Sequence, residues 1–146
     1  MQIETTRFGA LSVDESRVLT FPEGLPGFEG CRHFTLVPHP APSGEDCAFE
    51  WIQSVEDGAL AFLAIDPRRV FSAYEPQLAY GEMQTLALEH TDGARWYCLL
   101  TVPKGDPCGI TANLLAPVVV NPEARLAKQV ILSSDEYGLR HRLLPN

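Results

Sequence analysis

The chain has 146 residues, of which 45% are hydrophobic and 21% are charged, and its formal net charge at pH 7 is -8. These values are typical of one globular domain, so they exclude a chain that is disordered along its body. The negative charge disfavours a nucleic-acid-binding protein, which usually carries a basic patch, and it favours a basic protein partner.

Short strands are predicted along the whole chain. Twelve prolines and eleven glycines divide the sequence into short runs that are rich in β-branched and aromatic residues, as strands are. These runs are Gln2 to Phe8, Leu11 to Asp14, Arg17 to Phe21, His33 to Val37, Ala48 to Ser54, Ala59 to Ile65, Thr85 to His90, Trp96 to Val102, Pro117 to Val120 and Gln129 to Leu132. They predict an all-β fold, a small closed or half-closed β-barrel-like domain with one or two short helices.

Two short helices are expected between the strands. Asp66 suits the cap of a helix and Pro67 its first position, so Arg68 to Tyr74 is predicted to form two helical turns. Pro122 to Lys128 is a second candidate for a short helical turn. The Asp-Gly pair within Thr91 to Ala94 predicts the turn of a β-hairpin.

The chain contains no linker that would divide it into two domains. Residues 1–137 are predicted to form the barrel-like domain, and residues 138–146 a short amphipathic tail that frays or docks on a partner. The loop Pro38 to Asp46 is rich in proline and acidic residues, and is expected to be exposed.

Enzyme signatures are missing from the sequence. It contains no G-x-S-x-G, no phosphate-binding G-x-x-x-x-G-K-[ST] and no H-E-x-x-H, and its His and Cys residues lack metal-ligand spacing. We therefore expect no catalysis, no cofactor and no metal. The enzymatic alternative is a thiol-dependent hydrolase that uses Cys31, because Cys98 alternates with Trp96 and Leu100 as a core residue does.

The cysteines and the N-terminus indicate where the protein acts. Four cysteines, Cys31, Cys47, Cys98 and Cys108, include no C-x-x-C pair. The N-terminus lacks the cationic start and apolar run of a signal peptide, and no apolar stretch is long enough to cross a bilayer. We expect reduced thiols in a cytoplasmic protein that does not contact a membrane.

Two segments combine aromatic residues with residues that fix the backbone. Phe21 to Glu29 interleaves prolines, glycines and phenylalanines, and is predicted to be a structural corner whose phenylalanines plug one end of a barrel. A binding role is the alternative. In Asp66 to Pro76, the aromatic rings of Phe71 and Tyr74 beside Glu75 either anchor a protein partner or face the core.

A third segment is bracketed by asparagines. In Thr111 to Pro122 a run of small and branched residues lies between Asn113 and Asn121. Asparagine side chains bond neighbouring backbone groups in turns, so both positions are expected to hold turns.

Seven motifs follow one another along nearly the whole chain: Ile3 to Gly9, Phe21 to Phe28, Trp51-Ile52-Gln53-Ser54, Phe71 to Glu75, Asn113 to Pro117 with Asn121, Lys128 to Leu132, and Tyr137. In this order they resemble the FliW family of flagellar assembly factors. The chain departs from the family pattern at Trp51, in its long proline-rich loop and in its four cysteines.

The resemblance implies a binding protein with two partners, flagellin and CsrA, an RNA-binding translational repressor. Flagellin that accumulates would occupy the protein and free CsrA to repress flagellin translation, and export of flagellin would reverse this. The resemblance also implies a small β-barrel without a cofactor, monomeric when alone. The partner-binding residues that it implies are Phe71, Tyr74, Glu75, Pro76 and Asn113.

In this scheme Glu75 would pair with an Arg or Lys of CsrA, and Phe71 and Tyr74 would be its apolar anchors. The alternative is a small barrel that binds single-stranded nucleic acid, with Trp51, Phe71 and Tyr74 as stacking platforms.

Overall fold

The structure is a computed structural model that describes residues 1–38, 49–105, 109–133 and 136–142. Its strands are β1 (Gln2–Thr5), β2 (Gly9–Ser12), β3 (Leu19–Thr20), β4 (His33–Pro38), β5 (Phe49–Ser54), β6 (Ala61–Ile65), β7 (Arg95–Thr101), β8 (Thr111–Ala112), β9 (Val118–Asn121), β10 (Leu126–Gln129) and β11 (His141–Arg142). Its helices are α1 (Tyr80–Thr85) and three 3-10 helices, η1 (Glu15–Arg17), η2 (Pro67–Arg69) and η3 (Thr91–Gly93). The described chain is therefore mostly β.

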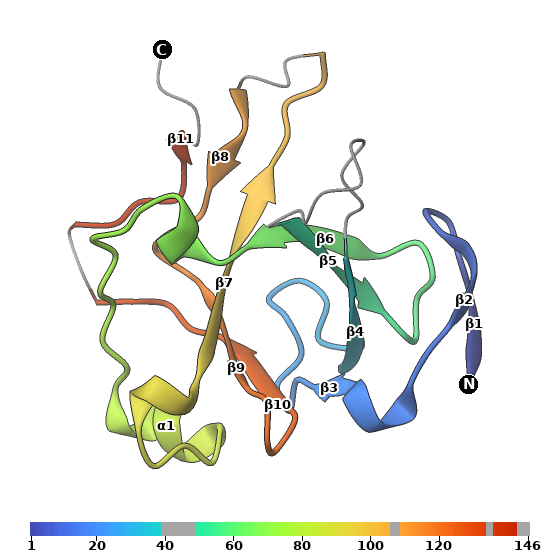
Figure 1. Ribbon diagram of the computed structural model, residues 1–146, viewed down its shortest axis with the longest axis horizontal. Helices are drawn as coiled ribbons and strands as arrows, with labels where there is room; N and C mark the ends of the chain where they lie inside the picture. The colour runs from blue at the N-terminus through green and yellow to red at the C-terminus, as the bar shows by residue number, and fades with distance from the viewer. Residues whose placement is uncertain (39–48, 106–108, 134–135, 143–146) are drawn as a thin grey trace.

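The central strands form a closed barrel (Figure 1). The order β7-β6-β5-β4-β3-β10-β9 returns to β7, because Trp96 and Tyr97 of β7 pair with Val119 and Val118 of β9. Neighbouring strands in this ring are antiparallel, except that β3 and β10 run parallel and meet at Thr20 and Leu126. The predicted all-β, barrel-like fold is confirmed, and the barrel is closed.

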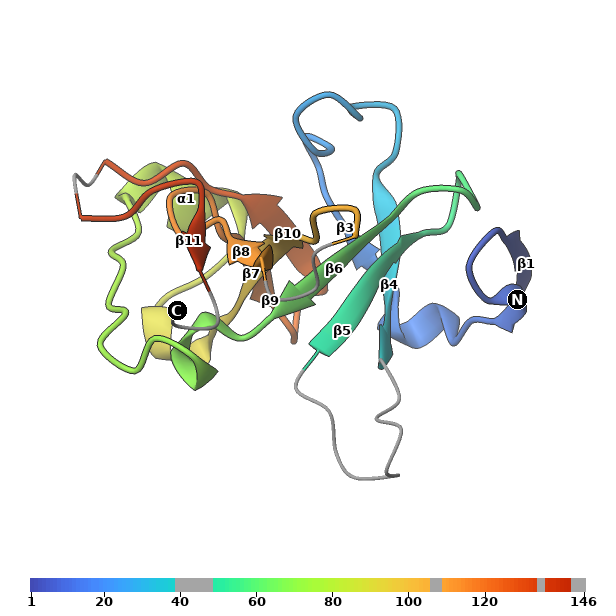
Figure 2. The same ribbon diagram turned by 90° about the horizontal axis from the view of Figure 1, so that it is seen from above.

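Two pairs of strands lie outside the barrel, on opposite sides of the molecule (Figures 1 and 2). The hairpin of β1 and β2 lies at one end, and β8 and β11 extend the sheet beyond β7 at the other. β11 pairs with β8 through His141 and Ala112. The predicted tail, residues 138–146, therefore contains a strand of the sheet, and residues 143–146 lie outside the described residues.

Strands β7 and β9 separate two hydrophobic clusters. Val118 and Val120 pack with Phe21 and Phe34 in the first cluster, inside the barrel. Val119, one residue out of phase, packs in the second cluster with Trp96, Tyr74 and Leu86. Every residue of β9 is buried, as expected for a strand that is covered on both faces. The second cluster also contacts Phe71 and Tyr137, so it supports the segment in which partner-binding residues were predicted.

The predicted corner at Phe21 to Glu29 fills the barrel with only one of its phenylalanines. Phe21 is fully buried and its ring lies edge-on to Phe34, with 4.9 Å between ring centroids. Phe28 is 43% exposed and rests on Phe62 at the surface. Gly24 and Gly27 have φ angles of +68° and +87°, which explains the glycines of this turn.

The predicted strand Thr85 to His90 is wrong. The helix α1 occupies Tyr80–Thr85, and Leu86 N–H bonds back to the Glu82 carbonyl. Alternating leucines imitate a strand here, but Ala87 has a φ of +56° and the fully buried Leu86 faces the second cluster. The Asn121 amide donates to the carbonyl oxygens of Leu86 and Ala87 at 2.8 and 3.2 Å and fixes this turn.

Two further local predictions need correction. Pro122 to Lys128 is not helical: the Asn121 side chain accepts the N–H groups of Glu123 and Ala124, and the chain then turns into β10. Thr91–Gly93 is the 3-10 helix η3 and does not join two strands, because the element directly before it is the helix α1. Strand β10 spans Leu126–Gln129, so the predicted strand Gln129 to Leu132 overlaps it only at Gln129. Residues 39–46 of the predicted loop lie outside the described residues.

Candidate functional site

The segment from Asp66 to Pro76 begins as the sequence predicts and then departs from it. The Asp66 carboxylate accepts the Arg68 N–H at 3.0 Å, and Pro67 occupies the first helical position. The helix ends at Arg69, however, so the predicted two turns to Tyr74 do not form. The chain turns inward because the Tyr74 ring enters the second cluster.

Tyr74 is a core residue and not an exposed ring. Its side chain is 2% exposed, and its hydroxyl donates to the Leu114 carbonyl at 2.7 Å. The ring lies edge-on to that of Tyr137, 4.6 Å away. Burial, followed by nearby Cys98 and Tyr137, raises the pKa of Tyr74 above its ordinary value. Of the two sequence interpretations for this ring, the structure agrees with the core.

Phe71, Glu75 and Pro76 reach the surface to different degrees. Phe71 is half-buried, with its ring 5.9 Å from that of His141. Glu75 is exposed, and its backbone N–H donates to the Tyr137 hydroxyl at 3.1 Å. Pro76 is half-buried. Tyr74 and Tyr137 together thus hold the backbone that presents Glu75.

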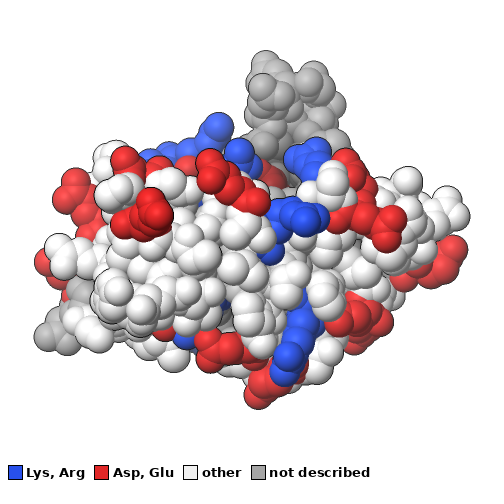
Figure 3. All heavy atoms as spheres, turned by 90° about the horizontal axis from the view of Figure 1, so that it is seen from below, with Lys and Arg blue, Asp and Glu red and all other residues white. Residues whose placement is uncertain are grey.

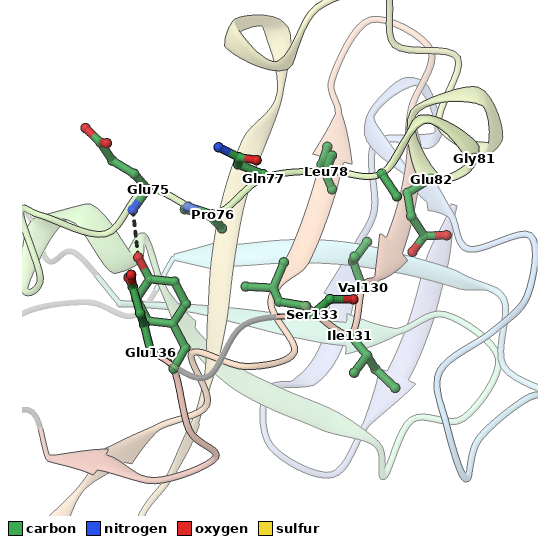
Figure 4. A pocket seen from close by; sticks show the side chains of 13 residues that line it. Glu75, Pro76, Gln77, Leu78, Gly81, Glu82, Val130, Ile131, Ser133 and Glu136 are labelled. Atoms are coloured by element: carbon green, nitrogen blue, oxygen red, sulfur yellow. Dashed lines mark hydrogen bonds between the residues drawn. The ribbon is translucent and has the colours of Figure 1, made fainter.

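Glu75 and Pro76 begin one wall of a groove, shown in Figure 4. This wall consists of residues 75–79 with Gly81 and Glu82, and the facing wall consists of residues 130–133 with Glu136 and Tyr137. We name the space between them the acidic groove; its volume is about 670 Å³. In Figure 4, Glu75 and Glu136 lie at one end and Glu82 lies at the other. The groove therefore combines carboxylates with the aliphatic side chains of Leu78, Val130, Ile131 and Leu132.

Lys128 offsets the charge at the Glu82 end of the groove. Its ammonium group lies 2.6 Å from the Glu82 carboxylate and 2.9 Å from that of Glu23. The hydrogen bonds to Glu82 and Glu23 outweigh partial burial and raise the pKa of Lys128. The acidic character of the groove is consequently strongest at the Glu75 end.

Asn113 lies outside the groove and supports it through the backbone. Its side-chain oxygen accepts the Ala116 N–H at 3.0 Å, as expected for an asparagine that holds a turn. The next residue, Leu114, offers its carbonyl to Tyr74 and donates its N–H to the Gly138 carbonyl. Asn113 is half-buried. Sequence analysis grouped it with Tyr74, and the structure joins the two through this turn.

A second hollow, of about 290 Å³, brings Arg68 and Arg69 together with Arg95. The carboxylates of Glu50 and Asp66 line the same hollow. Burial raises the pKa of Glu50, although Arg95, Arg17 and Arg69 oppose that shift. Acidic groups thus interrupt this basic cluster. On the face in Figure 3, too, basic side chains lie between acidic ones.

The residues required for nucleic-acid stacking are not brought together. Trp51 is half-buried beside the β1–β2 hairpin, with the Arg7 guanidinium 3.9 Å from its ring centroid. Phe71 contacts β11 on the opposite side of the molecule, and Tyr74 is in the core. The three rings form no shared platform.

The thiols are also separated from any catalytic arrangement in the described part of the chain. Cys98 is fully buried in β7, and burial raises its pKa to about 12. Cys31 is half-buried, and no hydrogen bond joins it to His33, whose Nδ1 lies 3.0 Å from Glu56 Oε2. Cys47 and Cys108 lie outside the described residues.

Sequence analysis missed most of the groove. One wall includes Gln77, Leu78 and Glu82, which were not among the predicted site residues, and Ile131 in the other wall is 71% exposed. Alternation in Gln129 to Leu132 indicates an extended segment, but it does not tell which edge of that segment lacks a neighbour.

Within the described residues, no helix is long and apolar enough to cross a membrane, and no three His, Cys, Asp or Glu side chains gather to hold a metal ion.

Comparison with known proteins gives a consistent result. The family model described as "FliW protein" matches residues 2–143. The flagellar assembly factor FliW of Moorella thermoacetica is 39% identical over 143 residues, which cover 98% of this chain and 88% of that protein. The one of Bdellovibrio bacteriovorus is 42% identical over 140 residues, covering 96% of this chain and 77% of that protein.

The fold agrees with a solved structure of the same kind. A crystal structure of the flagellar assembly factor FliW superposes with a TM-score of 0.89 at 34% identity, covering 100% of this chain and 99% of that chain. The resemblance drawn from the motifs thus extends to the whole sequence and to the closed barrel. The chain belongs to the FliW family of flagellar assembly factors.

Proposed function

We propose that the chain binds flagellin and the translational regulator CsrA, and that it antagonises CsrA so that flagellin translation follows flagellin export. It acts in the cytoplasm as a monomer, by binding alone, without catalysis and without contact to nucleic acid or membrane. Flagellin that accumulates occupies the chain and frees CsrA to repress translation. Family membership supports this scheme through the resemblance described above.

The observation that carries the CsrA part of the proposal is the acidic groove beside Glu75. An RNA-binding protein presents basic surface to phosphates, and an acidic surface attracts it and speeds their encounter. The chain has a net charge of -8, and Glu75 is exposed at the end of the groove. We propose that Glu75 and Pro76 contact CsrA, with Phe71 beside them at the surface. Tyr74 and Asn113 act by holding this segment in place.

Reversing the charge of Glu75 tests the proposal. Glu75→Lys is expected to weaken CsrA binding about tenfold or more, because like charges then face each other across the interface. Its melting temperature should stay near that of the wild type, since the side chain is exposed and, among the described residues, only the backbone N–H of Glu75 is hydrogen-bonded. Isothermal titration calorimetry with purified CsrA, and separately with purified flagellin, measures both affinities.

Glu4→Lys is the matched control, because Glu4 is exposed on β1 at the opposite side of the molecule. It makes the same change in net charge and should leave CsrA binding nearly intact. Equal losses of CsrA affinity in the two variants would show that the net charge of the chain, and not the acidic groove, determines binding. A wild-type chain that binds neither partner would refute the proposed function.

A further inference from the structure

The groove wall at residues 130–133 continues the pairing of β10 beyond the end of that strand. Val130 N–H donates to the Pro117 carbonyl at 2.9 Å, and Leu132 N–H donates to the Leu115 carbonyl at 2.8 Å. Figure 4 shows Val130 and Ile131 pointing to opposite sides of the segment, which is the alternation of an extended strand. One edge of this segment is therefore paired.

The other edge is open. Because N–H groups alternate along an extended chain, that of Ile131 lies on the edge opposite to Leu115 and Pro117. Across the residues that the structure describes, neither the N–H nor the carbonyl of Ile131 has a hydrogen-bond partner. Its side chain is 71% exposed. Proteins usually block an open edge with lysine, proline or a bulge, and residues 130–133 contain neither lysine nor proline.

The surroundings of this edge favour a basic segment. The residues that bear it line the acidic groove, with Glu75 and Glu136 at one end. Exposed Ile131 adds apolar surface beside these carboxylates. An open edge recognises the main chain of an extended peptide, while neighbouring side chains select its alternate residues. Here they would select aliphatic residues and residues with positive charge.

We propose that the edge at Val130–Ser133 accepts an extended, Lys- or Arg-bearing segment of the protein partner as an added β-strand. This inference rests on the proposed function, under which that partner is CsrA. Main-chain hydrogen bonds to Ile131 give the contact its register, and Glu75 adds the charge pairing.

A proline at the open edge tests strand addition. Ile131→Pro removes one N–H that has no partner among the described residues, and proline is tolerated at strand edges that face solvent. CsrA binding should weaken about tenfold, as expected for loss of main-chain pairing at this position. Ile131→Val keeps the N–H and a β-branched side chain, and should stay within about twofold of the wild type. Titration with purified CsrA and thermal melting measure binding and folding.

Hydrogen exchange on the wild-type complex is independent of whether the proline variant folds. The amide of Ile131 should exchange more slowly when CsrA is bound, and that of exposed Glu4 should not change. Unchanged exchange at Ile131 in the complex, or equal affinities of the proline and valine variants, would overturn strand addition. If Glu75→Lys still weakens binding in that case, the proposed function survives. If the wild-type chain does not bind CsrA, the strand addition and the proposed CsrA antagonism are both refuted.

Discussion

At the scale of single residues, Tyr74 shows how a local pattern acquires its meaning from burial. Its sequence neighbours, with Phe71 on one side and Glu75 on the other, are equally compatible with an anchor for a partner and with a core residue. The structure buries the ring and pairs its hydroxyl with Leu114, forty residues away along the chain. Glu75, the next residue, is exposed, and its backbone N–H is held by the Tyr137 hydroxyl.

Tyr74→Phe should lower the free energy of unfolding by about 1–2 kcal/mol, because the buried Leu114 carbonyl loses its hydrogen-bond donor. Tyr80→Phe removes the same hydroxyl from a side chain that is 75% exposed, and should change stability very little. Urea unfolding of both variants provides the comparison. Equal stabilities for the two would contradict a structural role for the Tyr74 hydroxyl.

At the scale of elements, the turn after β3 shows what a glycine contributes. A Cβ on Gly24 would lie 2.7 Å from the Glu29 Cα, whereas a Cβ on Gly27 would meet no atom within 4 Å. Both residues have positive φ, so a side chain at either position would strain the backbone, and the two positions differ in available space. Sequence analysis identifies the glycines of this turn but not which of them is approached by backbone.

The two glycines make a matched pair of substitutions. Gly27→Ala should cost about 1–2 kcal/mol of stability, the usual price of placing a side chain at positive φ. Gly24→Ala should cost clearly more, because the neighbouring backbone must also shift. Chemical denaturation measures both; an effect of Gly27→Ala as large as that of Gly24→Ala would contradict the close approach.

At the scale of the whole molecule, Lys128 connects three parts of the chain. It lies on β10, and its ammonium group bonds Glu82 of α1 and Glu23 of the turn after β3. The raised pKa of Lys128 means that the folded protein binds its proton more tightly than the unfolded chain does. Its contribution is therefore fully present below an unfolded pKa of 10.5 and disappears as pH rises through the folded value.

Lys128→Met should destabilise the protein by about 1–2 kcal/mol at neutral pH, since it leaves the half-buried Glu82 carboxylate without a partner. The matched control is Lys104→Met, which removes the same charge from an exposed position. Thermal melts at neutral pH measure the difference between them. A loss that persists undiminished well above pH 10.5 would contradict the role of the ammonium group.

The sequence by itself determined the β class and the positions of most strands, because short runs rich in β-branched residues that are bounded by glycine and proline are typical of strands. It also placed the cap at Asp66 and the asparagine-held turns at Asn113 and Asn121, since these bonds lie within a few residues. The order of motifs along the chain indicated the FliW family. The strands, the cap and the turns depend on residues that are close in sequence, and the family resemblance depends on several motifs that occur in the same order.

Only the tertiary structure decided which faces and edges are covered. The strand-like pattern of Thr85 to His90 became the end of α1 and a turn, because Leu86 is buried against the second cluster and Asn121 holds its carbonyl. Tyr74 turned inward, and the edge at Ile131 was left open beside the acidic groove. Burial and edge pairing depend on residues far away along the chain, so no local pattern specifies them.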